Sequence, residues 1–184
     1  LARWCVASGF TILARRRHGH RLRILMYHGV VPSVRGPAGY GDLFVSADDF
    51  DRQLRHLRRA FAVLSLDEAI GHLVDRRPFP ERALAITFDD GYRNVVTTAW
   101  PILKAHRVPA TVFIPAALAG QPALYWFDAL RLLAAQCAAA RTTARVGDGI
   151  VVDGRAADGE RTLRDAIDRI GRLPLGEADG VVES

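Results

Sequence analysis

The stretch Ala83-Leu84-Ala85-Ile86-Thr87-Phe88-Asp89-Asp90-Gly91-Tyr92 carries the strongest information about the fold. Its first six residues are too apolar for a strand with one face in water, so they predict a strand that is covered on both sides. Two acidic residues and a glycine follow at once. Two carboxylates directly after a covered strand are costly unless something uses or compensates their charge.

Strand-like and helix-like segments alternate upstream of this stretch. Residues 22–27 form a short apolar run that ends at His28-Gly29, which predicts a buried strand entering a turn. Two helix starts follow, with Ser46 as the first N-cap and the capping box Ser65-Leu66-Asp67-Glu68 as the second. The first helix has one apolar face, formed by Phe50, Leu54, Leu57 and Phe61. A short strand over residues 62–64 is expected to separate it from the second helix, which is expected to continue to Pro78.

The alternation continues downstream. A helix is expected over residues 94–105, with Pro101 kinking it or marking its restart, and a short buried strand over residues 111–114. Further on, we expect a helix at 128–140, a brief strand at 150–152 and a helix at 157–170. Strands that alternate with crossover helices pair in parallel, so the chain is expected to have an α/β fold.

The acidic pair is the candidate site for chemistry. In parallel α/β sheets, reacting residues collect at the C-terminal ends of strands, where Asp89 and Asp90 fall. Both carboxylates can serve one pocket if the backbone turns, and Gly91 permits a turn. One carboxylate would then bind a divalent cation, while the other takes a proton from water. By itself, Asp-Asp-Gly is more typical of an Asx-turn or a helix N-cap than of a reacting pair, and the covered strand that precedes it favours the reacting pair.

The run Thr87–Tyr92 resembles the first motif of the polysaccharide deacetylases, the carbohydrate esterase family 4 or NodB homology domain. The similarity extends in the right order over about residues 22–130. The segments that carry it are Leu25-Met26-Tyr27-His28-Gly29-Val30, residues 44–68, Trp100-Pro101-Ile102-Leu103-Lys104, Pro109-Ala110-Thr111-Val112-Phe113 and Tyr125-Trp126-Phe127-Asp128.

This resemblance implies a metal-dependent hydrolase that removes acetyl groups from a polysaccharide, with Asp89 as catalytic base and Asp90 as metal ligand. The implied cofactor is a divalent metal, zinc first, and the implied partner is an acetylated polysaccharide such as an N-acetylglucosamine polymer. The implied fold is the irregular (β/α) barrel of the family. His28 and Tyr92 are candidates for the substrate cleft, although a histidine after a strand is often structural.

The sequence departs from the family at the metal-binding histidines. The family uses a downstream His-x-x-x-His segment, whereas the histidines here form no such pair: His18, His20, His28, His56, His72 and His106. A catalytic zinc usually has three protein ligands. We therefore expect a partial barrel truncated before closure, inactive by itself, with an unpaired strand edge that lowers solubility. The alternative is a non-catalytic protein that keeps the fold and binds a glycan or a partner.

The expected organisation is a basic arm at 1–21, the N-terminal part of the deacetylase domain at 22–127, a helical insertion at 128–175 and a tail at 176–184. Residues 1–41 hold seven arginines and no acidic residue, which raises a nucleic-acid binder as a further alternative. No aromatic interleaving or known module supports it, and nucleic acid is not an expected partner. A phosphoryl-transfer enzyme also places acids after a strand, but the surrounding residues do not resemble one.

The chain shows neither a membrane-spanning run nor a signal-peptide pattern, since the uncharged stretch at residues 4–14 is too short. Cys5 and Cys137 match no metal or redox spacing. A location in the cell envelope or outside the cell is expected from the family resemblance.

Overall fold

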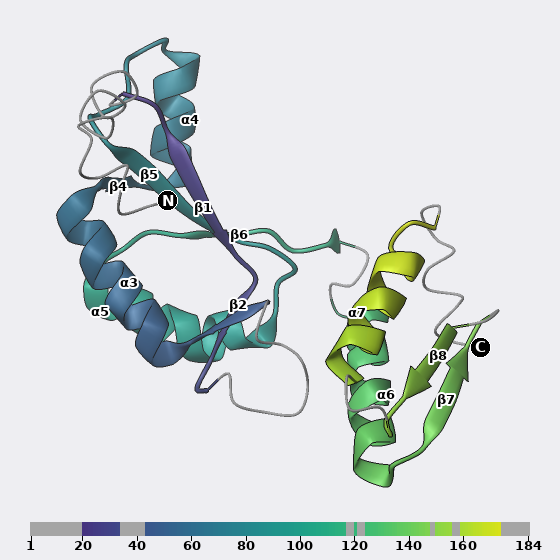
Figure 1. Ribbon diagram of the computed structural model, residues 1–184. Helices are drawn as coiled ribbons and strands as arrows, with labels where there is room; N and C mark the ends of the chain where they lie inside the picture. Colours follow the sequence, from purple (N-terminus) through teal and green to yellow (C-terminus); the bar gives the residue numbers. More distant parts are fainter. Residues whose placement is uncertain are drawn as a thin grey trace, which may run out of the picture. The chain divides into compact units, whose positions relative to one another are not determined.

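The computed structural model describes residues 20–33, 43–116, 120, 124–147, 150–155 and 159–173. By contact, the chain divides into two compact units, the first made of Leu1–Val34 and Asp42–Ala116 and the second of Arg35–Gly41 and Ala117–Ser184. Figure 1 shows both units. The expected division of the chain into a deacetylase part that ends at residue 127 and an insertion that follows it stays a prediction. The expected tail and most of the expected basic arm lie outside the described residues.

A parallel sheet forms the centre of the first unit. Strand β5 (Ala83–Phe88) is buried at all six positions, as its composition predicts. It pairs along its whole length with β1 (Arg23–Tyr27). Its other edge is shared by β4 (Ala62–Leu64), which pairs with Ala83–Ala85, and β6 (Thr111–Val112), which pairs with Thr87 and Phe88 (Figure 1). The mixed α/β fold class is therefore confirmed.

Strand β6 corrects the expectation of a buried strand over residues 111–114. It ends at Val112, and the side chains of Val112, Phe113 and Ile114 are 40%, 50% and 64% exposed. Strand β5 ends at Phe88 and the chain turns at Asp90, so no continuing strand pairs with residues beyond Phe113. In the part of the chain that the structure describes, the sheet is open, and its closure into a barrel stays a prediction.

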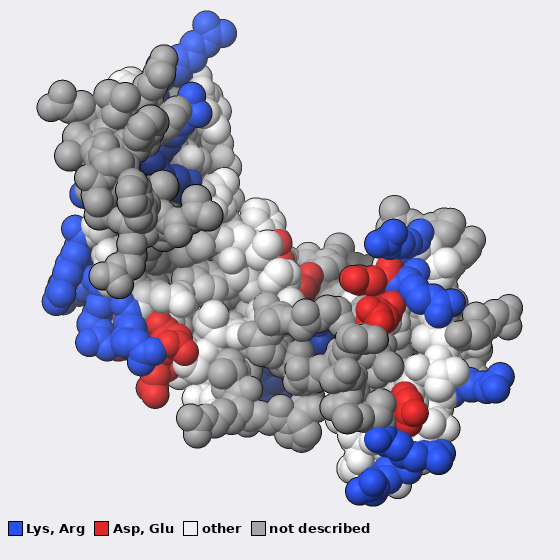
Figure 2. Space-filling view, in the orientation of Figure 1, with Lys and Arg blue, Asp and Glu red and all other residues white. Residues whose placement is uncertain are grey.

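The first two helices begin where the caps predict. Helix α3 (Ala47–Ala60) has Ser46 as its N-cap, and its buried residues are Phe50, Leu54 and Leu57. Helix α4 (Leu66–Val74) has the complete capping box of Ser65 and Glu68, and it ends four residues before the expected Pro78. Ion pairs between residues three or four apart place opposite charges side by side along α3, as Figure 2 shows.

Pro101 shapes the third helical segment. A π-helical turn, η2 (Val95–Ala99), runs directly into α5 (Trp100–His106), and Pro101 lies at the start of α5. The N–H of Trp100 bonds to the oxygen of Val95, five residues back. Because proline has no N–H and crowds the preceding turn, a wider turn accommodates it without ending the helix. The expected helix at 94–105 is therefore a π-helical turn that changes to an α-helix where Pro101 lies.

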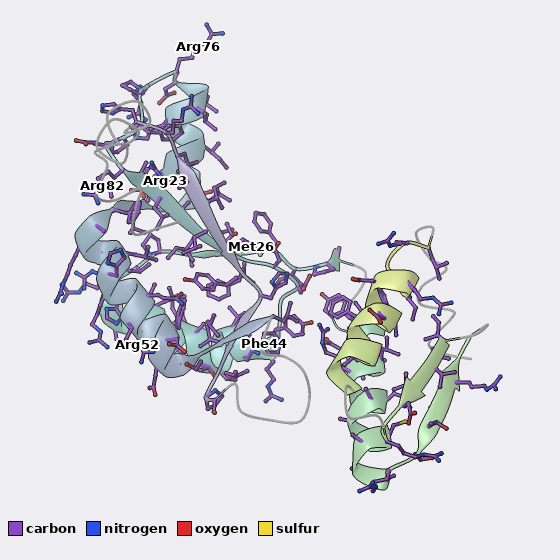
Figure 3. All side chains as sticks on the ribbon, in the orientation of Figure 1. Arg23, Met26, Phe44, Arg52, Arg76 and Arg82 are labelled. Carbon is purple, nitrogen blue, oxygen red and sulfur yellow. The ribbon has the colours of Figure 1, made fainter. Side chains whose placement is uncertain are left out.

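The core of the first unit is aromatic at its centre. The Tyr27 ring stacks on Phe88 at 5.5 Å between centroids and meets the edge of Phe50 at 5.2 Å. The Tyr27 hydroxyl donates to Oε1 of Gln53 at 2.6 Å. At one end of the sheet, the guanidinium groups of Arg23 and Arg82 lie over the ring of Phe61 (Figure 3).

The second unit has a separate core. Helices α6 (Trp126–Ala140) and α7 (Gly159–Ile170) pack with an antiparallel hairpin of β7 (Thr143–Val146) and β8 (Ile150–Asp153). The hairpin shows that this region is not purely helical, and strand β7 had not been predicted. The buried residues of this second core are Leu130, Cys137, Val146, Ile150, Val152, Leu163, Ala166 and Ile170. None of the described helices has the length and apolar character needed to cross a bilayer.

Candidate functional site

The end of β5 is held on both sides by backbone hydrogen bonds. The N–H of Asp89 donates to the oxygen of Tyr27 at 2.9 Å, which extends the pairing with β1 by one residue. On the other side, the N–H of Phe113 donates to the oxygen of Phe88 at 2.8 Å. These bonds fix the backbone where the acidic pair begins.

The backbone then turns sharply through two left-handed residues. Asp90 has φ 68° and Gly91 has φ 63°. Left-handed backbone is unfavourable for most side chains, although aspartate is enriched there, and such conformations cluster at functional sites. A Cβ at Gly91 would lie 3.1 Å from Cγ1 of Ile114, so this position has little room for a side chain.

The turn brings both carboxylates to one groove. Asp89 and Asp90 line an open hollow of about 470 Å³ together with Phe113, Ile114 and Pro115. On an extended strand, neighbouring side chains would point to opposite faces. Sequence analysis required a backbone turn for the two carboxylates to share one pocket, and the turn at Asp90 and Gly91 provides it.

His28 reaches the same acidic pair from the neighbouring strand. The register pairs Tyr27 with Phe88, so the residues that follow each strand lie together at one rim. Nε2 of His28 is 3.8 Å from Oδ2 of Asp90, and the two side chains are 30% and 25% exposed. Burial raises the pKa of Asp90, the nearby His28 opposes that rise, and the charge of Asp89 adds to it.

Asn94 supports the turn that carries His28. Strand β2 (Gly29–Val31) starts directly after His28, pairs in parallel with β3 (Phe44–Ser46) and packs against η2. The Asn94 side chain fills the space beside Gly29, and its buried Oδ1 has no hydrogen-bond partner among the described residues. Sequence analysis gave Asn94 no role, because its position depends on packing between distant segments.

Tyr92 is placed differently from the acidic pair. Its ring meets the ring of Phe44 edge to face at 5.0 Å, and it packs against the core of the first unit. Phe44 is labelled on β3 in Figure 3. Tyr92 is not among the residues that line the groove with Asp89 and Asp90. A role for Tyr92 in a substrate cleft stays a prediction.

The other described histidines lie elsewhere. His106 is the last residue of α5; its side chain is 14% exposed and its Nε2 lies 2.6 Å from Oδ1 of Asp51. His56 lines a separate pocket with Leu25 and Tyr27. Within the described ranges, no group of three or more His, Cys, Asp or Glu residues is arranged to hold a metal ion.

The segment that contains the acidic pair is similar to a known protein family. Residues 76–143 match the family model for polysaccharide deacetylase. This segment is therefore similar to part of a polysaccharide deacetylase domain. The deacetylase match includes β5, the turn at Asp90, β6 and helix α6.

Two curated proteins show the same relationship. A Bacillus subtilis (strain 168) protein named as a polysaccharide deacetylase, YxkH, is 30% identical over 95 residues, which is 51% of this chain. A poly-beta-1,6-N-acetyl-D-glucosamine N-deacetylase of Staphylococcus aureus (strain MSSA476) is 37% identical over 71 residues, or 38% of this chain. The matches span 32% and 24% of the lengths of these two relatives.

Solved structures of deacetylases are also similar to this chain. A Streptococcus pyogenes deacetylase in complex with acetate has 28% identity and a TM-score of 0.48, covering 61% of this chain and 51% of that one. IcaB from Ammonifex degensii has 29% identity and a TM-score of 0.48, covering 62% and 49%.

Proposed function

We propose that this chain forms part of a hydrolase that removes acetyl groups from a polysaccharide. The observation that carries the proposal is the shared groove of Asp89 and Asp90 at the C-terminal end of β5, inside the segment that matches the deacetylase family. An acetylated polymer of N-acetylglucosamine is the proposed substrate class, because one relative is named for that activity. The cell envelope or the outside of the cell is the proposed location, as the resemblance to the deacetylase family implies.

The proposed reaction is hydrolysis of the acetamide bond. Asp89 accepts a proton from a water molecule in the groove, and the water oxygen forms a bond to the acetyl carbon. The bond between that carbon and the sugar nitrogen then breaks, and the nitrogen takes up the proton that Asp89 had accepted. The products are acetate and a free amino sugar. Asp89 suits the role of base because it lies in the groove and its backbone is fixed by the bond to Tyr27.

Asp90 is the proposed metal ligand. Its carboxylate lies in the groove with that of Asp89, and carboxylate oxygens are common ligands of zinc and related divalent ions. A bound divalent metal would polarise the acetyl oxygen and lower the pKa of a water ligand. Asp90 would neutralise part of the charge of that ion, while Asp89 remains available for the proton.

The apolar rim of the groove has a separate role in this proposal. Phe113, Ile114 and Pro115 line it beside the acids, and the first two side chains are at least half exposed. An acetyl methyl group or the apolar face of a sugar ring would cover this surface and displace water from it. We therefore assign these residues to substrate contact.

The test compares oligomers of N-acetylglucosamine with the same oligomers after chemical deacetylation, with zinc or cobalt added. We expect the acetylated form to bind more tightly and to shift NMR signals of residues 113–115. Acetate is assayed in the same samples, with Asp89→Asn as the test variant and Glu81→Gln, an exposed acid, as the matched control.

The outcomes separate the alternatives. Acetate release that is lost in Asp89→Asn and kept in Glu81→Gln would establish hydrolysis and correct the prediction that this chain is inactive by itself. Equal binding of both oligomers without release would favour a glycan-binding protein that keeps the deacetylase fold. A folded chain that neither binds the acetylated oligomer nor releases acetate would contradict the proposed function.

A further inference from the structure

The end of the first unit that lies opposite to the acidic groove is rich in arginine. Strands β1, β4 and β5 are parallel, so their first residues lie at one edge of the sheet, and the C-terminal ends of α3 and α4 lead into that edge. The acidic residues of these connecting segments are Asp75 and Glu81. The arginines, which together form the basic end, are Arg21, Arg23, Arg58, Arg59, Arg76, Arg77 and Arg82.

Contacts between distant segments hold the basic end together. The guanidinium groups of Arg23 and Arg82 lie 6.0 Å and 5.5 Å from the centre of the Phe61 ring. The N–H of Ala62 donates to the oxygen of Arg82 at 3.1 Å, which joins the start of β4 to the segment before β5. Figure 3 shows Arg23, Arg76 and Arg82 at this end of the unit. Arginines from separate parts of the sequence therefore gather in one place.

Helix α4 presents an apolar face beside these arginines. Its side chains Ile70, Leu73 and Val74 are 47%, 61% and 74% exposed. Residues three and four apart share one face of a helix, and Ala69, which is buried, marks the opposite side that packs on the sheet. The solvent face of a surface helix is ordinarily polar. Leu73 and Val74 lie in the last turn, directly before the arginines of residues 75–82.

We propose that the basic end and the apolar face of α4 dock on the surface of an anionic lipid bilayer. Leu73 and Val74 enter the boundary between headgroups and acyl chains, and the arginines lie at the level of the lipid phosphates. Nucleic acid also attracts arginine clusters, but its phosphate backbone offers no apolar layer to cover Leu73 and Val74. This inference goes beyond the proposed function and does not depend on it, because these residues do not line the groove of Asp89 and Asp90.

The acidic pair does not oppose this docking. Asp89 follows β5 and Arg82 precedes it, so a strand rise of about 3.3 Å per residue separates them by roughly 20 Å. Charges are largely screened beyond about 8 Å at physiological ionic strength. A bilayer bound at the basic end would therefore leave the groove open on the side that faces away from the lipid.

The experiment measures co-sedimentation of the full chain with vesicles of phosphatidylcholine, alone or mixed with an equal amount of phosphatidylglycerol. We expect binding to the anionic vesicles, weakened by added salt, and much less binding to phosphatidylcholine alone. In the double variant Arg58→Gln with Arg59→Gln, affinity should fall about tenfold or more, since each arginine near an anionic surface contributes about fivefold. Both side chains are exposed in the last turn of α3. The matched control is Arg145→Gln with Arg169→Gln, two exposed arginines of the second unit.

The apolar face is tested by Leu73→Gln with Val74→Gln. We expect affinity to fall about tenfold, because the burial of two aliphatic side chains in lipid is lost. The matched control is Leu132→Gln with Val151→Gln, which are 50% and 45% exposed in the second unit. Circular dichroism checks the folding of every variant.

Hydrogen exchange of the unaltered chain gives a readout that needs no variant. Anionic vesicles should slow exchange at residues 70–77 and leave residues 111–116 unchanged. Protection at residues 111–116 with none at 70–77 would overturn the assignment, as would equal binding of both kinds of vesicle. Tighter binding to duplex DNA than to anionic vesicles, unchanged in Leu73→Gln with Val74→Gln, would overturn it in favour of nucleic acid. Vesicle binding without acetate release would support this inference while the proposed hydrolysis fails.

Discussion

The side chain of Asn94 occupies the space that a Cβ atom on Gly29 would need. Such an atom would lie 2.8 Å from Nδ2 of Asn94 and closer still to Oδ1. Gly29 follows His28, and Asn94 follows the turn at Asp90 and Gly91 by three residues. This contact therefore joins the two chain segments that supply the candidate site.

Gly29→Ala is expected to destabilise the first unit by about 1–3 kcal/mol, the usual cost of adding a methyl group where there is no space. The measurement is the free energy of unfolding from urea denaturation. In an Asn94→Ala background the same substitution should cost less, because the colliding side chain is gone. Additive effects of the two substitutions would show that Gly29 and Asn94 are not coupled.

Asp90→Asn is expected to raise the thermal stability at pH 7. The pKa of Asp90 is raised above its usual 3.8, chiefly by burial, so the ionised form is less favourable in the folded chain than in the unfolded chain. The stability that comes from neutral Asp90 is present below the unfolded pKa and is lost as the pH rises through the raised pKa. Asparagine also tolerates the left-handed backbone at this position.

The advantage of Asp90→Asn should therefore shrink as the pH falls towards 4. Melting temperatures of both proteins between pH 4 and pH 7 measure it, with Glu81→Gln as the control for loss of an exposed acid. A variant that melts below the unaltered protein at pH 7 would show that the carboxylate makes stabilising contacts that outweigh its burial.

The features that sequence predicted well are local ones. Composition alone indicated that β5 is covered on both sides, and Ser46 and Ser65 marked the helix starts because capping depends on residues three positions apart. The placement of Asp89 and Asp90 at a strand end followed from the apolar run of β5, which stops directly before them. The proximity of His28 to Asp90 followed from the parallel register, in which strand ends meet at one rim.

The features that sequence missed depend on distant contacts. Strands β2 and β3 have three residues each, too few for a periodic pattern, and they exist because they pair with one another. The contact of Asn94 with Gly29 joins residues far apart in the chain. The exposure of Phe113 and Ile114 was also missed, because an apolar run gives no sign of whether another segment covers it.

Leu54→Ala is expected to reduce the stability of the first unit by about 2–5 kcal/mol, because the side chain is fully buried in the core and its removal leaves a cavity. Leu73→Ala is the matched control, since Leu73 is also helical but 61% exposed. Its effect should stay within about 0.5 kcal/mol. Equal losses in the two variants, measured by urea denaturation, would contradict the assigned packing of α3.

The contact between His106 and Asp51 predicts a dependence of stability on pH. Nε2 of His106 donates to Oδ1 of Asp51 at 2.6 Å and joins α5 to α3. This hydrogen bond lowers the pKa of Asp51, Arg55 lowers it further, and burial opposes both. A lowered pKa means that the ionised carboxylate stabilises the folded chain above its usual pKa of 3.8 and loses that effect as the pH falls through the lowered value.

Asp51→Asn should therefore be less stable than the unaltered protein at pH 6, and the difference should close as the pH falls below about 4, near the ordinary aspartate pKa. His106→Ala and the double variant complete a cycle that isolates the contribution of the pair from other effects of each substitution. Urea denaturation between pH 3 and pH 6 measures the coupling energy. We expect it to be favourable at pH 6 and to become smaller as the pH falls below the ordinary aspartate pKa, because a protonated carboxyl group attracts the imidazole less strongly. A coupling energy that stays constant over this range would show that the ionisation of Asp51 contributes nothing to the packing of α5 on α3.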